Sequence, residues 1–261
     1  MEKTTHDSLR IGIDVGGTAI KYGVVNTTTG TLVSPIAQQH TPQPANPAAI
    51  AKAVRAIVAD VQSWETTPSQ FAAVGVAFPA IIRQGTAFSA ANISDEWIGQ
   101  KVEMLLEEAL QRTVHVVNDA DAAGQAETSH GAGKGHKGAV LVLTLGTGIG
   151  SALMINGNLV PNLELGHLEI GGLKAETTTS AVARENEGLS WIDYSSRLQQ
   201  YLSHVEFLFS PDLIIIGGGI SVRHEEFLPQ IRLATPIRPA QLHNSAGVIG
   251  AAQSAGRTDL P

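Results

Sequence analysis

The chain of 261 residues contains no cysteine. This absence excludes disulfides, thiolate nucleophiles and cysteine-ligated zinc. Aromatic residues are also scarce, at 5% of the chain, although 43% of it is hydrophobic. A core built from Leu, Ile, Val and Ala favours buried parallel strands flanked by helices over an all-β sandwich.

Basic residues are outnumbered, since 17 Lys and Arg stand against 24 Asp and Glu for a net charge of −7. The chain therefore has no overall basic surface for a nucleic acid, and we expect no nucleic-acid partner. A polyanionic ligand would have to be bound by a local cluster of charges.

Targeting and membrane segments are not evident either. The first ten residues, MEKTTHDSLR, lack the apolar stretch of a signal peptide. The uncharged stretch 138–163 is interrupted by glycines and by Asn156-Gly157-Asn158, a turn sequence, so it predicts strands rather than a membrane helix. We expect a cytoplasmic protein without a membrane partner.

Strand and helix patterns alternate along the chain. Residues 9–25 predict two strands around a glycine turn, and buried strands are expected at 71–78, 114–117, 140–154 and 213–216. Helices are expected from about Pro47 and at 101–111, 120–129, 191–209 and about 246–255.

An apolar strand that enters a Gly/Thr turn occurs twice. The segment from Gly12 to Thr18 resembles the segment from Val142 to Gly148, about 130 residues later, and this spacing indicates two similar halves. We therefore expect two α/β domains, 1–117 and 118–261, with the last helix able to pack back on the first domain.

Three glycine clusters follow predicted strands. They are Gly16-Gly17-Thr18, Gly146-Thr147-Gly148 and Gly217-Gly218-Gly219. Glycine lets backbone N–H groups converge on an anion, and Thr adds a hydroxyl donor, although any one cluster could be a simple turn. None matches a P-loop or a dinucleotide-binding fingerprint, so phosphate binding here points to another fold.

Charged residues in apolar surroundings are candidates for chemistry. Asp14 lies within an apolar strand, which suits either water-mediated Mg²⁺ binding or capping of local amides. Asn118, Asp119 and Asp121 open a helix after a buried strand. They are ordinary helix caps, but one cap suffices, so a second carboxylate could accept a proton from a substrate hydroxyl.

Two carboxylates and an imidazole occur within residues 164–169. Glu164, His167 and Glu169 could hydrogen-bond a polyhydroxylated ligand, which needs both donors and acceptors. Metal binding by this cluster stays an alternative, but a zinc deaminase site is excluded by the lack of cysteine.

Together these motifs resemble the ROK family of sugar kinases and repressors, from about residue 9 to residue 255. The resemblance implies an α/β, actin-like ATPase (ribonuclease H-like) fold with a cleft between two domains, and a homodimer. Segments 118–124, 131–135, 160–162, 201–204 and 209–212 are similar to the family members that phosphorylate glucose with inorganic polyphosphate.

The resemblance implies a role for each motif. Asp119 would be the general base for the glucose 6-hydroxyl, and Asp14 would orient Mg²⁺. The sugar hydroxyls would be bound by Asn92, Asn118, Asp119, Glu164 and His167. The phosphates would be bound by Gly16, Gly17, Thr18, Lys21, Gly146, Thr147 and Gly148. Gly217, Gly218 and Gly219 would face a nucleoside if ATP binds.

Two further assignments are less direct. Many family members carry a cysteine-rich zinc loop, followed by another Glu that binds the sugar. No zinc is expected here, because the chain has no cysteine. Glu176 is the candidate for this last sugar contact, with Glu169 as the alternative. Lys134 and Lys137, in the glycine-rich loop 131–138, would suit polyphosphate because Lys is a point charge on a flexible stem. They could equally be solvated loop charges.

Three functions can be compared with these motifs. A polyphosphate- or ATP-dependent glucose kinase fits best, with a strictly ATP-dependent glucokinase or glucomannokinase as its variant. A sugar-responsive repressor would need a DNA-binding segment ahead of the first glycine cluster. An actin-like filament protein would leave Asp119, Glu164 and His167 unexplained.

Overall fold

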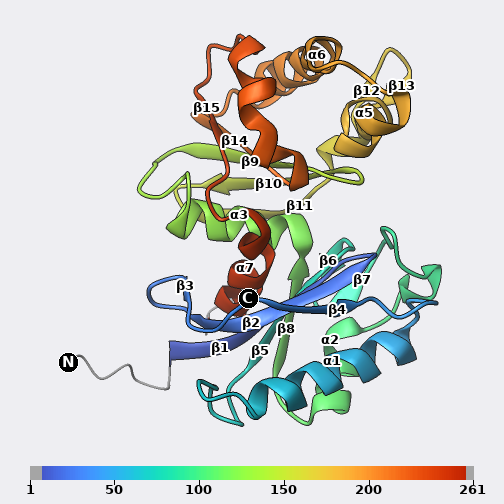
Figure 1. Cartoon of the computed structure of the whole chain (residues 1–261), viewed down its shortest axis with the longest axis vertical. Coiled ribbons are helices and arrows are strands. Elements are labelled where there is room, and N and C mark those ends of the chain that lie inside the picture. Colours follow the sequence, from blue (N-terminus) through green and yellow to red (C-terminus); the bar gives the residue numbers. More distant parts are fainter. Residues whose placement is uncertain (1–7, 257–261) are drawn as a thin grey trace. The chain divides into compact units, whose positions relative to one another are not determined.

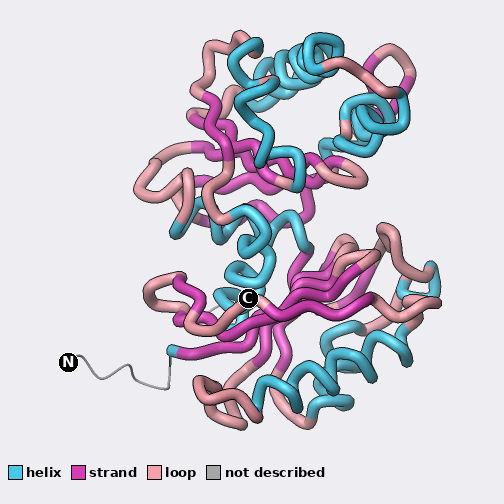
Figure 2. Tube along the Cα trace, in the orientation of Figure 1, coloured by secondary structure: helices cyan, strands magenta, loops and turns pink. Residues whose placement is uncertain are grey.

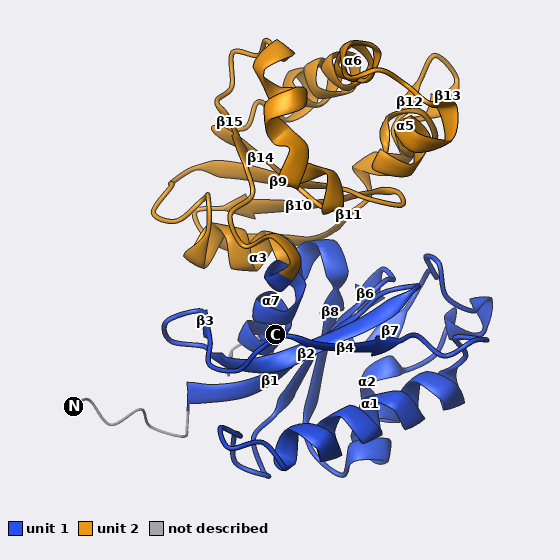
Figure 3. Ribbon diagram, viewed as in Figure 1, with its two compact units in different colours: residues 1–122, 245–261 blue, residues 123–244 orange. Residues whose placement is uncertain are grey.

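The structure is a computed structural model that describes residues 8–256 (Figure 1). Contacts divide the chain into two compact units (Figure 3). Unit 1 comprises residues 1–122 and 245–261, and unit 2 comprises residues 123–244. Each unit combines a β-sheet with helices (Figure 2).

Unit 1 contains a six-stranded sheet with the order β3-β2-β1-β5-β8, and β4 also pairs with β2. Its strands are β1 (Leu9–Val15), β2 (Ala19–Asn26), β3 (Thr31–Leu32), β4 (Ala37–His40), β5 (Val74–Phe78) and β8 (Val114–Asn118). Strands β1, β5 and β8 are parallel, whereas β2 is antiparallel to β1. The carboxyl ends of β1, β5 and β8 therefore share one edge of the sheet.

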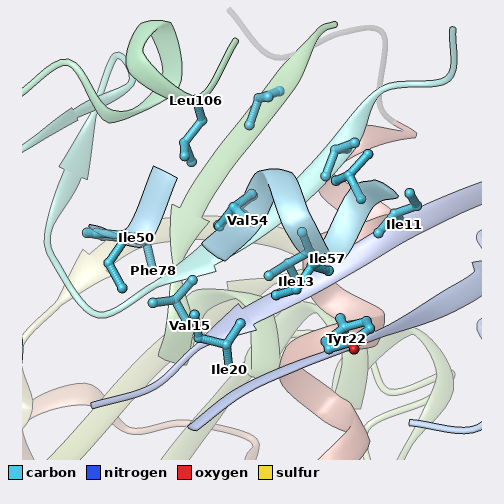
Figure 4. Close-up of a cluster of buried hydrophobic side chains, with 14 of the residues drawn as sticks. Ile11, Ile13, Val15, Ile20, Tyr22, Ile50, Val54, Ile57, Phe78 and Leu106 are labelled. Carbon is cyan, nitrogen blue, oxygen red and sulfur yellow. The ribbon is translucent and has the colours of Figure 1, made fainter. Parts of the chain in front are cut away.

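Helices α1 (Pro47–Gln62) and α2 (Val102–Leu110) cover one face of this sheet. Helix α1 begins where the Asn46 side chain accepts a hydrogen bond from Ala49 N at 3.0 Å, with Pro47 in the first turn. Its apolar face packs on β1, where Ile13 lies beside Ile57 (Figure 4). A short hairpin of β6 (Ile82–Arg83) and β7 (Thr86–Ala87) precedes α2.

Helix α7 (Ala246–Ala255) covers the opposite face. Gly12 and Gly75 are direct neighbours across β1 and β5. A Cβ at Gly12 would overlap the carbonyl of Val248, and one at Gly75 would overlap that of Ala251. The missing side chains let the helix backbone lie directly on the sheet, which explains the small-residue composition of α7.

Unit 2 contains a five-stranded sheet with the order β11-β10-β9-β14-β15. Its strands are β9 (Ala139–Leu145), β10 (Ile149–Ile155), β11 (Asn158–Leu163), β14 (Leu213–Gly217) and β15 (Ile237–Pro239). Three consecutive antiparallel strands are followed by two parallel ones, as along the path in unit 1. The internal repeat predicted from the sequence is thus confirmed in the topology.

Helices also cover both faces of the second sheet. Helix α6 (Trp191–Phe209) contributes Tyr194, Leu198 and Tyr201 to one core cluster. Helix α3 (Asp119–His130) packs on the other face, where a Cβ at Gly124 would overlap that of Ala152. Shorter elements precede α6: β12 (Glu169–Ile170), β13 (Leu173–Lys174), α4 (Ala175–Thr179) and α5 (Ala181–Glu187).

The expected helices at 101–111, 120–129, 191–209 and 246–255, and the one beginning at Pro47, are confirmed to within two residues. The expected strand at 71–78 begins later, at Val74. The boundary between the two compact units lies after Ala122. The division into domains 1–117 and 118–261 stays a prediction. Within residues 8–256, no helix has both the length and the apolar character needed to span a bilayer.

Candidate active site

The first glycine cluster forms a tight turn between β1 and β2. Gly16 N donates to Ala19 O at 3.0 Å, and Thr41 holds the turn through Oγ1 to Gly16 O (2.6 Å) and N to Thr18 O (2.9 Å). A Cβ at Gly17 would lie 2.8 Å from the Cβ and O of Asn92. Asn92 therefore lies directly against this turn and leaves no room for a side chain at position 17.

Asp14 lies at the end of β1, opposite Lys21 in the β1–β2 ladder. Burial raises the pKa of Asp14, and the Lys21 ammonium partly offsets this shift. A Cβ at Gly247 would lie 2.6 Å from Asp14 Cγ, so the start of α7 faces the carboxyl group.

This environment fits one protein ligand of a divalent cation. Mg²⁺ commonly takes one or two carboxylates and fills its other positions with waters and substrate phosphates. Residues 8–256 hold no group of three or more His, Asp or Glu that could enclose a metal. A cation at Asp14 would therefore depend on the phosphates of a bound donor for its remaining ligands.

Asn118 ends β8 and Asp119 follows it, at the same sheet edge as Asp14. The buried Asn118 caps α3, because its Oδ1 accepts from Ala120 N (2.9 Å) and Asp121 N (3.1 Å). Its Nδ2 donates to Ala80 O at 3.0 Å. Asp119 is half-buried, whereas Asp121 is only 1% exposed. Asp119 is thus the carboxylate that a substrate can reach.

In unit 2 the second and third glycine clusters lie side by side. Gly146 N donates to Gly148 O at 3.0 Å, and Gly146 O accepts from Val182 N of α5 at 3.2 Å. Gly218 has a φ of 79°, and a Cβ there would overlap the backbone of Leu145. Only glycine accommodates both the positive φ and this close approach to the end of β9.

Glu164, His167 and Glu176 form one polar cluster. His167 Nε2 lies 3.3 Å from Glu176 Oε1. Burial raises the pKa of the Glu164 carboxyl; His167 opposes this shift, and the nearby Glu176 carboxylate adds to it. A Cβ at Gly148 would lie 2.6 Å from Glu176 Oε2, so the cluster adjoins the second glycine cluster.

Of the two candidates for the last carboxylate, Glu176 completes this cluster. Glu169 is exposed on β12 and lies opposite Lys174 in a two-residue hairpin. The hairpin β12–β13 lies between His167 and Glu176 in the chain, and it reverses the chain so that Glu176 contacts the His167 imidazole.

Ser151, Thr41 and Gly247 support the site but were not predicted from the sequence. Ser151 is fully buried, and its Oγ donates to Leu163 O (2.8 Å) and accepts from Leu165 N (3.0 Å), which fixes the backbone on both sides of Glu164. Thr41 holds the first glycine turn. Single hydroxyl residues carry no distinctive pattern, but Gly247-x-x-Gly250 in a small-residue helix could have signalled the close approach at Asp14.

Lys134 and Lys137 are not brought to the second glycine cluster. Their loop joins α3 to the beginning of β9, whereas Gly146 follows the end of β9 (Figure 1). The strand has seven residues. At ~3.3 Å per residue, the two ends of β9 lie about 20 Å apart.

Residues 10–188 match the family model described as ROK family. The chain is 41% identical to the polyphosphate glucokinase of Mycobacterium tuberculosis over 93% of this chain and 89% of the relative. It is 39% identical to the polyphosphate glucokinase of Mycobacterium leprae, over 96% of this chain and 76% of that one.

Two solved structures match nearly the whole chain. The inorganic polyphosphate/ATP-glucomannokinase from Arthrobacter sp. strain KM is 55% identical, with a TM-score of 0.92 over 95% of this chain and 98% of that one. The ROK family glucokinase from Streptomyces griseus, in complex with glucose and AMPPNP, is 26% identical, with a TM-score of 0.80 over 94% and 98%.

Proposed function

The chain belongs to the ROK family, and we propose that it transfers a phosphoryl group from inorganic polyphosphate or ATP to the 6-hydroxyl of glucose. Its fold is the actin-like ATPase fold of ROK sugar kinases, as the sequence predicts. The observation that carries the proposal is the cluster of Glu164, His167 and Glu176 beside the second glycine cluster, in a chain 55% identical to a polyphosphate/ATP-glucomannokinase.

Glucose is bound by groups that can both donate and accept hydrogen bonds. The carboxylates of Glu164 and Glu176 accept from sugar hydroxyls, and His167 presents a nitrogen donor or acceptor. Asn92 and Asn118 are the further proposed sugar contacts. Asn118 already caps α3, so only its second Nδ2 hydrogen is available to a ligand.

Asp119 acts as the general base. The oxygen of the 6-hydroxyl attacks the terminal phosphorus of the donor while an Asp119 oxygen takes the hydroxyl proton. The bond between that phosphorus and its bridging oxygen breaks, and the shortened polyphosphate or ADP leaves. Asn118 caps α3, and Asp119 Oδ1 accepts from Ala120 N at 2.8 Å, which orients the carboxylate that takes the proton.

The donor phosphates are bound at the glycine turns, which the Gly16 and Gly146 amides hold closed by donating to Ala19 O and Gly148 O. Gly16, Gly17, Thr18 and Lys21 form one subsite, and Gly146, Thr147 and Gly148 form the other. The turn Gly217 to Gly219 faces the nucleoside when ATP binds. Asp14 is the residue that would hold Mg²⁺, through water, and the cation would offset the negative charge on the donor phosphates.

A second sugar substrate is supported by one observation. The Arthrobacter enzyme, at 55% identity, is named a glucomannokinase, so mannose is the second acceptor to test. On the precedent of the family we also propose a homodimer located in the cytoplasm. The repressor and filament alternatives gain no support from relatives that are named as kinases.

A coupled assay for sugar 6-phosphate tests the function. Purified protein is given glucose or mannose with either polyphosphate or ATP, with and without Mg²⁺. We expect glucose 6-phosphate from both donors and only with the divalent cation. Activity with ATP alone would leave a strictly ATP-dependent kinase, and no product from either donor would contradict a kinase function.

A further inference from the structure

Basic side chains gather around the loop between α3 and β9, which lies at the end of β9 opposite the second glycine cluster. The loop after α3 exposes Lys134 and Lys137. Arg238 of β15 joins it, because its Nη1 donates to Ala132 O at 3.0 Å. Burial and the nearby Lys134 ammonium lower the pKa of His130, which shows that this charge lies close to the imidazole. We call Lys134, Lys137 and Arg238 the distal basic cluster.

The loop that carries this cluster is firmly anchored. Glu127, only 1% exposed, accepts the N–H of Ala132 at 2.9 Å through Oε2. Its two oxygens also accept from Gln241 N (3.1 Å) and Leu242 N (2.7 Å). Ala132 is thereby held at its N–H by Glu127 and at its carbonyl by Arg238, so the lysines follow a fixed turn.

The positive charge of the cluster is not cancelled by ion pairs. Within residues 8–256, Lys134, Lys137 and Arg238 form no salt bridge. Two carboxylates lie nearby: Glu127 accepts three backbone N–H groups, and Asp212 Oδ2 accepts from Ala139 N at 2.7 Å. The three cationic side chains outnumber them, so the local charge stays positive. The cluster can therefore attract an anion, although the chain as a whole is acidic.

The cluster connects to the glycine clusters through strands of the same sheet. Gly146 follows the far end of β9, about 20 Å from its beginning at ~3.3 Å per residue. Strand β15, which carries Arg238, ends beside the third glycine cluster, where Ala240 N donates to Ile216 O at 2.8 Å. A Cβ at Gly217 would lie 3.5 Å from that of Ala240.

We propose that the distal basic cluster binds a remote part of a long polyphosphate chain whose end occupies the glycine clusters. This inference rests on the proposed kinase function and adds a second anion site to it. A polymer can reach both sites at once, whereas the three phosphates of ATP or tripolyphosphate are too short to do so. Simultaneous attachment raises the local concentration of the polymer end at the transfer site.

The test compares donors of different length. The variant Lys134→Ala/Lys137→Ala is assayed with long-chain polyphosphate, tripolyphosphate and ATP, and Lys52→Ala/Arg55→Ala on α1 removes the same charge from an exposed surface of unit 1. We expect KM for long polyphosphate to rise about two- to thirty-fold only in the first variant, the range for loss of two exposed charge contacts. Its KM for tripolyphosphate, ATP and glucose should change little.

Direct binding separates this inference from the kinase function. Titration calorimetry with long polyphosphate should show weaker binding by the Lys134/Lys137 variant than by wild type and the control variant. If wild type binds polyphosphate but transfers nothing from it, the polyphosphate kinase function fails while the distal site stands. Equal binding by all three proteins, or an equal KM rise for long and short donors, would overturn the distal site.

A purely structural role for the lysines gives a different result. Lysines after a helix can stabilise its carboxyl end, here that of α3. That role predicts a lower melting temperature for the Lys134/Lys137 variant and unchanged polyphosphate binding. Such an outcome would also reject the proposal.

Discussion

His167 Nε2 and Glu176 Oε1 lie 3.3 Å apart, although a β-hairpin separates the two residues in the chain. The other oxygen of Glu176 lies next to Gly148, where a Cβ would approach it to 2.6 Å. One carboxylate thus links the polar cluster to the second glycine cluster. A sugar bound at the first would lie close to a phosphate bound at the second, as phosphoryl transfer requires.

Replacing Asp119 by Asn should remove the general base and keep the fold. The amide has the same shape but cannot take the proton, so kcat should fall by ~10²–10⁴. The cap of α3 is supplied by Asn118 and stays in place, so the melting temperature should hardly change. Steady-state kinetics and thermal melting check both points. A variant that keeps more than about a tenth of kcat would require another base, because the loss would fall short of this range.

The two candidate sugar carboxylates can be told apart by matched substitutions. Glu176→Gln removes the negative charge beside His167 and turns one acceptor oxygen into an NH₂ donor, whereas Glu169→Gln changes an exposed side chain. We expect KM for glucose to rise in the first variant by an amount equivalent to ~1–3 kcal/mol, with donor KM little changed. His167→Ala should behave in the same way. Equal effects of Glu176→Gln and Glu169→Gln would contradict the assignment.

The ionisation of Glu164 should lower the stability of the protein at neutral pH. Burial raises the pKa of Glu164 above its ordinary value of 4.5, so the folded state binds this proton more tightly than the unfolded state. The resulting stabilisation is complete below the unfolded pKa and is lost as pH rises through the folded pKa. Glu164→Gln removes the titration.

Melting curves across pH test this prediction. The melting temperature of Glu164→Gln relative to wild type should increase as pH rises above about 4.5, while KM for glucose increases as the sugar acceptor is lost. Glu169→Gln, at an exposed position, serves as the control. A melting difference that is the same at every pH would show that the carboxyl group does not titrate as described.

The regular elements were predictable because they carry strong local signals. Helix α1 has Pro47 and an apolar stripe, and α6 was predicted with its observed bounds because Ser210-Pro211 ends a long amphipathic pattern. Strands β4, β12 and β13 were missed. They are short, and polar or exposed residues dominate them, so pairing with a neighbouring strand, rather than local pattern, defines them.

The candidate site was predictable where one motif carries one function. The glycine clusters and the Asn118-Asp119 pair could be located in the sequence, but only the structure separates the cap Asn118 from the accessible Asp119. The sequence could not choose between Glu169 and Glu176, because a hairpin decides which carboxylate returns to His167. The sequence also suggested that Lys134 lies near Gly146, because only one strand separates them in the chain. In the structure the two residues lie at opposite ends of that strand, β9.

The close approach of α7 to Asp14 gives a test of the proposed cation site. A Cβ at Gly247 would lie 2.6 Å from both Asp14 Cγ and Oδ2, so Gly247→Ala must displace the carboxyl group or the start of the helix. If Asp14 orients Mg²⁺, the variant should need a higher Mg²⁺ concentration for half-maximal activity and show a lower kcat, with KM for glucose unchanged. Asp14→Asn, which removes the negative charge, should raise the Mg²⁺ requirement further.

The control for this prediction is Gly23→Ala in the same sheet. A Cβ at Gly23 would meet the end of the Leu32 side chain at 3.1 Å, which can move away, so the Mg²⁺ dependence should stay that of wild type. Thermal melting of Gly247→Ala separates a local shift of Asp14 from loss of α7 packing, because only the latter lowers stability substantially. An unaltered Mg²⁺ requirement in both Gly247→Ala and Asp14→Asn would mean that the cation is held without Asp14, and Mg²⁺ binding would then have to be assigned to the donor phosphates alone.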